Sequence, residues 1–172
     1  GLGAKHGFRE IVMRSPGRYE LSLLNLDSTR LMKGSSASPI LVPDTSLIFS
    51  LLEPLLPKLL GPKESIKLCD LSLLVATPGS VDQGWHADGG HVSIHEHLPC
   101  HCFNAFIPLQ DIPLCMGPTE FRPGSHFLTR NLGPMMLAAR CRKTLRAPVW
   151  QAAIMGDLVL FDYRVLHRGC AF

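Results

Sequence analysis

Proline and glycine limit the folds open to this chain more than any other feature of its sequence. The 172 residues include 14 Pro and 15 Gly. Proline cannot donate a backbone hydrogen bond inside a helix, and both residues favour turns. Their density therefore indicates many short segments joined by turns and disfavours a bundle of long helices.

Short apolar segments between these turns predict strands. The expected strands cover residues 18–23, 66–77, 102–112, 120–122, 149–154 and 158–163. The last two are predicted to pair as a hairpin, because Met155, Gly156 and Asp157 between them are typical of a tight turn. This pattern favours a mainly β fold, a β-sandwich or jelly roll, over a parallel α/β sheet.

A leucine-rich segment upstream of these strands predicts a helix. Leucines and one isoleucine recur between residues 47 and 60 at helical spacing, and Asp44 offers an N-cap. Pro54 and Pro57 must kink or break this helix, and Gly61 ends it. We therefore expect a single domain over 1–172, with an irregular and helical part at 1–65 and the β core at 66–172. Residues 126–147 are interpreted as a helical insertion.

Charge and composition exclude several classes of protein. Lys and Arg number 17 against 14 Asp and Glu, and this net charge of +3 does not favour a nucleic-acid partner. No apolar stretch reaches the length of a membrane span. The six cysteines, in a chain of this size without a visible secretion signal, predict free thiols and an intracellular, cytoplasmic location. The apolar end at Phe172 suggests a chain truncated at its C-terminus.

One histidine–carboxylate pattern predicts a metal site. His86 and Asp88 are two residues apart, so on a strand their side chains point to the same side. His167, at the end of a distant apolar strand, can supply a third ligand. Two imidazoles and one carboxylate leave coordination positions open, which suits Fe(II) that must bind a co-substrate and O2 together.

A second cluster suggests zinc instead. It is rich in imidazole and thiol groups, the ligands that zinc prefers. It lacks a Cys-x-x-Cys pair, which disfavours a structural zinc site. Its members are His91, His95, His97, Cys100, His101 and Cys102.

Four segments together resemble the phytanoyl-CoA dioxygenase-like family of Fe(II)/2-oxoglutarate-dependent oxygenases. They are residues 83–89 (QGWHADG), 104–111 (NAFIPLQD), 117–126 (GPTEFRPGSH) and 156–169 (GDLVLFDYRVLHRG). The resemblance implies a double-stranded β-helix, which is a jelly-roll or cupin-like fold, flanked by the N-terminal helix. It also implies that His86, Asp88 and His167 are the iron ligands and catalytic residues.

The resemblance further implies a reaction. The protein would be a dioxygenase that uses Fe(II), 2-oxoglutarate and O2 to hydroxylate a C–H bond of a small-molecule substrate. Asn104, Gln83 and Trp85 are predicted to contact the co-substrate. The family also supplies an arginine roughly ten residues after the distal histidine, and we expect it beyond Phe172 in the intact protein. The alternatives are an inactive jelly-roll module that binds a ligand or partner, and a structural His/Cys zinc domain.

Overall fold

The computed structural model describes residues 11–23, 46–128, 137, 140 and 143–172. The chain divides into two compact units, Gly1–Thr77 and Pro78–Phe172. Its strands outnumber its helices, and all of the strand pairs are antiparallel within the described residues. The predicted mainly β class is therefore confirmed.

Three antiparallel strands form the sheet of the first unit. They are β1 (Ile11–Ser15), β2 (Arg18–Ser22) and β3 (Ser72–Ala76), in the order β1-β2-β3. The strand predicted at 18–23 is confirmed as β2, whereas the one predicted at 66–77 is shorter. Strand β1 was not predicted from the sequence. It pairs with β2 through a turn at Gly17, whose φ of 76° is one that glycine adopts without strain.

The leucine-rich segment of the first unit forms two short helices rather than one. Helix α3 covers Ser46–Leu52 and α4 covers Leu56–Leu60, followed by the 3-10 turn η1 (Lys63–Ser65). The break falls at Pro54, as the sequence predicted, because proline has no N–H to continue the helix. The predicted N-cap Asp44 lies outside the described residues. No helix of the described part has both the length and the apolar character needed to cross a membrane.

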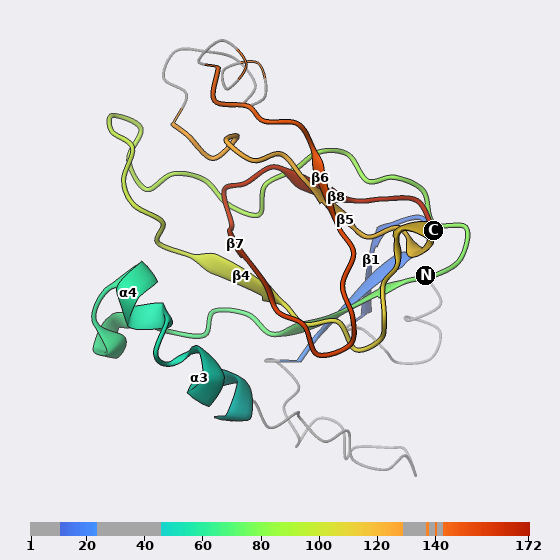
Figure 1. Ribbon diagram of the computed structural model, residues 1–172, viewed down its shortest axis with the longest axis horizontal. Helices are drawn as coiled ribbons and strands as arrows, with labels where there is room; N and C mark the ends of the chain where they lie inside the picture. The colour runs from blue at the N-terminus through green and yellow to red at the C-terminus, as the bar shows by residue number, and fades with distance from the viewer. Residues whose placement is uncertain (1–10, 24–45, 129–136, 138–139, 141–142) are drawn as a thin grey trace. The chain divides into compact units, whose positions relative to one another are not determined.

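Two facing sheets build the second unit (Figure 1). Strands β4 (Phe103–Phe106) and β7 (Val159–Asp162) form one sheet. Strands β5 (Thr119–Phe121), β6 (Val149–Gln151) and β8 (His167–Gly169) form the other in the order β6-β5-β8, and the 3-10 turn η2 covers Leu114–Met116. The strand predicted at 102–112 ends at Phe106 and leaves only an isolated bridge from Ile112 to Ala153.

The predicted hairpin between residues 149–154 and 158–163 is wrong. Strand β6 pairs with β5, and β7 pairs with β4 in the opposite sheet. The turn between them is fixed from outside: Met155 N donates to Asp111 Oδ1 at 2.8 Å and Gly156 N donates to Pro108 O at 3.1 Å. These bonds direct the chain across to the other sheet. Most of the helical insertion predicted at 126–147 lies outside the described residues.

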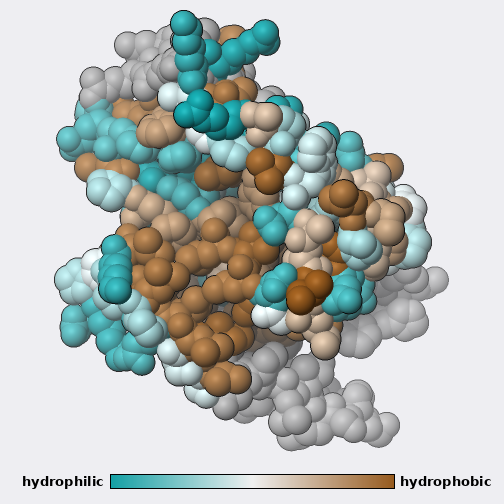
Figure 2. Space-filling view, viewed as in Figure 1, coloured by the Kyte–Doolittle hydropathy of each residue, from teal (hydrophilic) through white to brown (hydrophobic). Residues whose placement is uncertain are grey.

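Aromatic side chains join the two sheets of the second unit. The ring of Phe161 on β7 lies 4.8 Å from that of Phe121 on β5 and 4.9 Å from that of Phe106 on β4, measured between centroids. Phe121 and Phe161 are buried. Apolar residues also gather on the surface over β4 and β7 (Figure 2). This small aromatic core holds the two sheets at the spacing on which the site depends.

Replacing Gly124 with alanine should destabilise the protein by about 2 kcal/mol or more. Gly124 has a φ of 85°, and an added Cβ would lie 1.8 Å from Thr144 O. Gly84→Ala is the matched control, because no atom lies within 4 Å of its added Cβ. Urea unfolding of both variants provides the measurement. Equal stability of the two variants would show that neither the positive φ nor the close approach of Thr144 O requires a glycine at position 124.

Candidate metal centre

A reciprocal pair of backbone hydrogen bonds joins His86 to His167. His86 N donates to His167 O at 3.0 Å, and His167 N donates to His86 O at 2.8 Å. The two residues form an isolated antiparallel bridge at the start of β8. Their rings lie on the same side, with centroids 4.5 Å apart. This bridge brings together two histidines that are far apart in the sequence.

Asp88 completes a group of three potential ligands. Its Oδ2 lies 3.4 Å from His167 Nε2, and its Oδ1 lies 3.9 Å from His86 Nε2. One ligand atom from each of the three residues lies within 4.8 Å of the other two. Within the described ranges, this is the one group of three or more such residues that could hold a metal ion. The structure therefore brings together the three residues that the sequence predicted.

Backbone carbonyls orient both imidazoles. His86 Nδ1 lies 2.9 Å from Gly84 O, and His167 Nδ1 lies 3.0 Å from Val165 O. A carbonyl oxygen only accepts, so Nδ1 must donate its proton in both cases. The lone pair of each neutral ring is then on Nε2, the atom that faces Asp88. Both rings are thus set in the tautomer that can bind a metal ion.

Three contacts position Asp88 between the histidines. The amide of Asn104 on β4 donates to Asp88 Oδ2. The backbone N of Asp88 donates to Tyr163 O at 3.0 Å, and the next N, that of Gly89, donates to the same carbonyl at 3.3 Å. A Cβ on Gly89 would lie 1.8 Å from the Tyr163 ring, so this close approach requires glycine. Sequence reasoning missed Tyr163 and Gly89, and the glycine pair after Asp88 was the available signal.

The site is closed on one side and open on the other. The side chain of His167 is 5% exposed, with the rings of Phe161, Phe121 and Phe106 at centroid distances of 5.0, 5.9 and 6.4 Å. Burial lowers the pKa of His167, which keeps its ring neutral near pH 7. The side chains of His86 and Asp88 are 41% and 39% exposed. Open coordination positions would therefore lie toward these two residues.

Gln83 and Trp85, which precede His86, make contacts with Gly169, Arg122 and Arg168. Gln83 Oε1 accepts a hydrogen bond from Gly169 N on β8 at 2.9 Å. The guanidinium groups of Arg122 and Arg168 lie over the indole of Trp85, at 4.7 Å and 4.8 Å from the ring centroid. These contacts hold the segment against β8. A role of either residue at the co-substrate stays a prediction.

The histidine–cysteine cluster considered for zinc does not form a second metal-binding group among the described residues. Burial, followed by a hydrogen bond with Asp162, raises the pKa of the Cys100 thiol to about 11. A thiol with such a pKa is protonated at neutral pH. Cys69, Cys100 and Cys115 have free thiols, as predicted for the cysteines of this chain.

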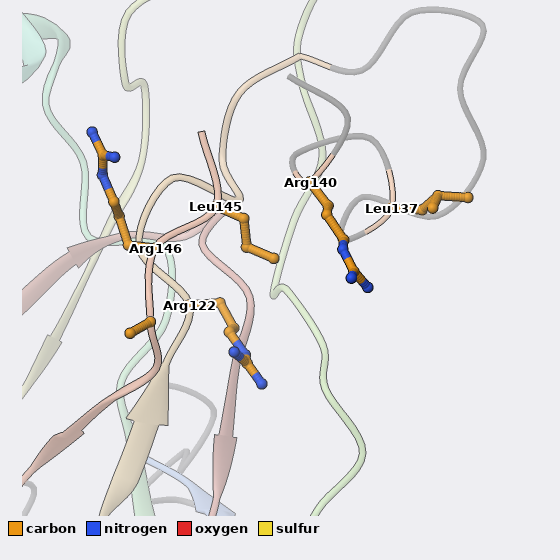
Figure 3. A pocket seen from close by; sticks show the side chains of 6 residues that line it. Arg122, Leu137, Arg140, Leu145 and Arg146 are labelled. Atoms are coloured by element: carbon orange, nitrogen blue, oxygen red, sulfur yellow. The ribbon is translucent and has the colours of Figure 1, made fainter. Parts of the chain in front are cut away.

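A separate surface cavity of about 520 Å³ lies outside the candidate metal centre. Arginines and small apolar residues line it: Arg122, Leu137, Arg140, Leu145, Arg146 and Ala147. Figure 3 shows the side chains of Arg122 and Arg140 extending in the same direction. The cavity includes none of the three potential ligands, so it is distinct from the space that they enclose.

The chain matches a family model over most of this region. The model for phytanoyl-CoA dioxygenase (PhyH) covers residues 58–171, more than half of the chain. The chain therefore belongs to this family, as the four sequence segments indicated. The family consists of oxygenases of the Fe(II)/2-oxoglutarate type, and its match includes all three potential ligands.

A buried ion pair lies next to the site, at the end of β7. Arg164 Nη2 donates to Asp162 Oδ2 at 2.6 Å, and Arg164 Nε donates to Oδ1 at 2.9 Å. Burial alone would raise the pKa of Asp162, but the hydrogen bonds with Arg164 and Cys100 and the charge of Arg164 together outweigh this effect and lower the pKa to about 2. The burial of this pair depends on the fold.

This pair should make the stability of the protein depend on pH. The pKa of Asp162 is lower in the folded chain than its ordinary value of 3.8, so its contribution is complete above about pH 5 and is lost as the pH falls toward 2. The full contribution is about 2 kcal/mol, of which roughly half is lost between pH 6 and pH 3.

Urea unfolding of the wild type and of Asp162→Asn at pH 6 and pH 3 measures this contribution. The free energy of unfolding of the wild type minus that of Asp162→Asn should be about 1 kcal/mol smaller at pH 3 than at pH 6. A difference that does not change with pH would contradict the lowered pKa.

Proposed function

We propose that the protein is an Fe(II)- and 2-oxoglutarate-dependent dioxygenase that hydroxylates a C–H bond of a small-molecule substrate. The observation that carries this proposal is the convergence of His86, Asp88 and His167, together with the membership of the family. A jelly-roll arrangement of the two facing sheets is part of the proposal. One fold and one kind of site can serve many different substrates.

The donor set fits a first-row metal ion. Two ligands on one ion lie at most about 4.2 Å apart when each bond is about 2.1 Å long. The separations of 3.4 and 3.9 Å from Asp88 to the two histidines fall within that span. Two neutral imidazoles and one carboxylate with an open side are the ligands typical of non-haem Fe(II) oxygenases.

Bound iron would supply the activation of O2 and the oxidation of 2-oxoglutarate that the family's chemistry requires. The residues of this chain have simpler tasks. The carbonyls of Gly84 and Val165 keep the histidine rings in their metal-binding tautomer, and the amide of Asn104 orients Asp88. The phenylalanine rings around His167 exclude water from the closed side.

We also propose that Asn104 contacts the co-substrate. Its Nδ2 donates to Asp88 Oδ2, so the amide lies immediately beside the position of the ion. The open side toward His86 and Asp88 is where 2-oxoglutarate, O2 and the substrate would enter. Gln83 and Trp85 are the weaker candidates for the same role, since their described contacts are to β8, Arg122 and Arg168.

His86→Ala and Asp88→Ala should each weaken metal binding by at least 100-fold, because each removes one of three protein ligands. Anaerobic titration with Fe(II) or Co(II) measures the affinity. His95→Ala is the control, because this exposed histidine belongs to the cluster that does not form a metal-binding group. Loss of binding in His95→Ala but not in His86→Ala would overturn the assignment of the site.

The reaction is tested on the intact protein with Fe(II) and 2-oxoglutarate. Without oxygen, we expect a weak visible charge-transfer band, and with O2 we expect succinate to form. The band should be absent in Asp88→Ala. A protein that binds Fe(II) but gives neither the band nor succinate would be the inactive binding module, and one that retains only zinc would be the structural alternative.

A further inference from the structure

We propose that Arg164 is a positioning residue of the metal centre, whose buried guanidinium clamps the turn that orients Asp88 and His167. The inference rests on the proposed function, and it concerns a residue that touches none of the three ligands in the described contacts. Arg164 is 2% exposed, so its guanidinium faces the interior of the protein rather than the open side of the site.

The residues on either side of Arg164 hold two of the ligands. Before it, Tyr163 O accepts hydrogen bonds from the backbone N of Asp88 at 3.0 Å and of Gly89 at 3.3 Å. After it, Val165 O accepts the hydrogen bond from His167 Nδ1 at 3.0 Å. A shift of this one turn would therefore move the carboxylate and change the direction of the imidazole at the same time.

The side chain of Arg164 fixes the turn from within. Its Nε and Nη2 form a two-pronged pair with the carboxylate of Asp162, whose Oδ1 also accepts from Arg164 N at 2.9 Å. Paired, parallel hydrogen bonds of this kind fix orientation as well as distance. Val165 N donates to Asp162 O at 2.9 Å and closes the turn.

The remaining nitrogen of the guanidinium reaches the segment that follows Asp88. Nη1 donates to Leu98 O at 3.1 Å and lies 3.4 Å from His91 Nδ1. Arg164 thus ties the 162–165 turn to residues 91–98 as well as to β7. A lysine keeps the charge but cannot make these bonds together, because its single ammonium lacks the planar fork. Position 164 therefore requires the planar shape of a guanidinium as well as its positive charge.

Arg164→Lys should therefore weaken Co(II) binding by about 10- to 100-fold, the range found when groups that orient metal ligands are removed. The visible spectrum of the bound Co(II) should also change, because it depends on the angles between the ligands. Arg146→Lys is the control, because Arg146 lines the separate surface cavity, which includes none of the three potential ligands. We expect its Co(II) affinity to change less than twofold.

Amide hydrogen exchange tests the same clamp without metal. In Arg164→Lys, exchange at the Asp88 and Gly89 amides should increase about tenfold relative to the Gln83 and His86 amides. The amides of Gln83 and His86 donate to the carbonyl oxygens of Gly169 and His167 on β8, so their hydrogen bonds do not depend on the 162–165 turn. A general loss of stability would accelerate all four amides together, so the pattern separates positioning from simple destabilisation.

If Arg164→Lys does not fold, Asp162→Asn/Arg164→Gln replaces it, because this double variant leaves neither partner charged. Wild-type Co(II) affinity and spectrum in a folded variant, or uniform exchange at the four amides, would overturn the role of Arg164. A wild-type protein that binds no Co(II) would instead refute the proposed function, and the exchange pattern would still decide whether Arg164 clamps the turn.

Discussion

Two backbone hydrogen bonds between His86 and His167 are the constraint on which the candidate site depends. They place one residue from the start of the second unit beside one from β8, near the end of the chain. Side-chain contacts between the two imidazoles would not by themselves hold these distant segments together, because ordering the segments costs conformational entropy. The aromatic packing between Phe121 and Phe161 keeps the two sheets together around this bridge. The site is therefore a product of strand pairing first and of side-chain chemistry second.

Three backbone carbonyl oxygens orient the side chains of the candidate site. Gly84 O and Val165 O hold the two imidazoles, and Tyr163 O holds the backbone at Asp88. Each of these oxygens belongs to a residue whose side chain has no part in ligation. The support for the ligands is thus encoded in the conformation of two short backbone segments. Substitutions that leave the ligands unchanged but alter these segments should still change how a metal ion is held.

The sequence predicted the class of fold from local apolar runs. It predicted the group of three potential ligands from the spacing of His86 and Asp88 and from the resemblance to the family. It did not predict that β6 and β7 belong to different sheets. The glycine turn at Gly156 has the local chemistry of a hairpin, and only its bonds to Pro108 and Asp111 direct it elsewhere. The burial of Arg164 was equally inaccessible, since it depends on where residues 91–98 lie. Register and burial come from tertiary contacts, on which a local pattern carries no information.

The unequal exposure of the three potential ligands has a consequence for how a bound ion would leave. His86 and Asp88 are each about two-fifths exposed, whereas His167 is 5% exposed and enclosed by aromatic rings. A chelator approaching from solvent would displace the two accessible donors before the enclosed one. Departure would then proceed through an ion held by a single nitrogen. Demetallation should accordingly be stepwise, with the bond to His167 breaking last.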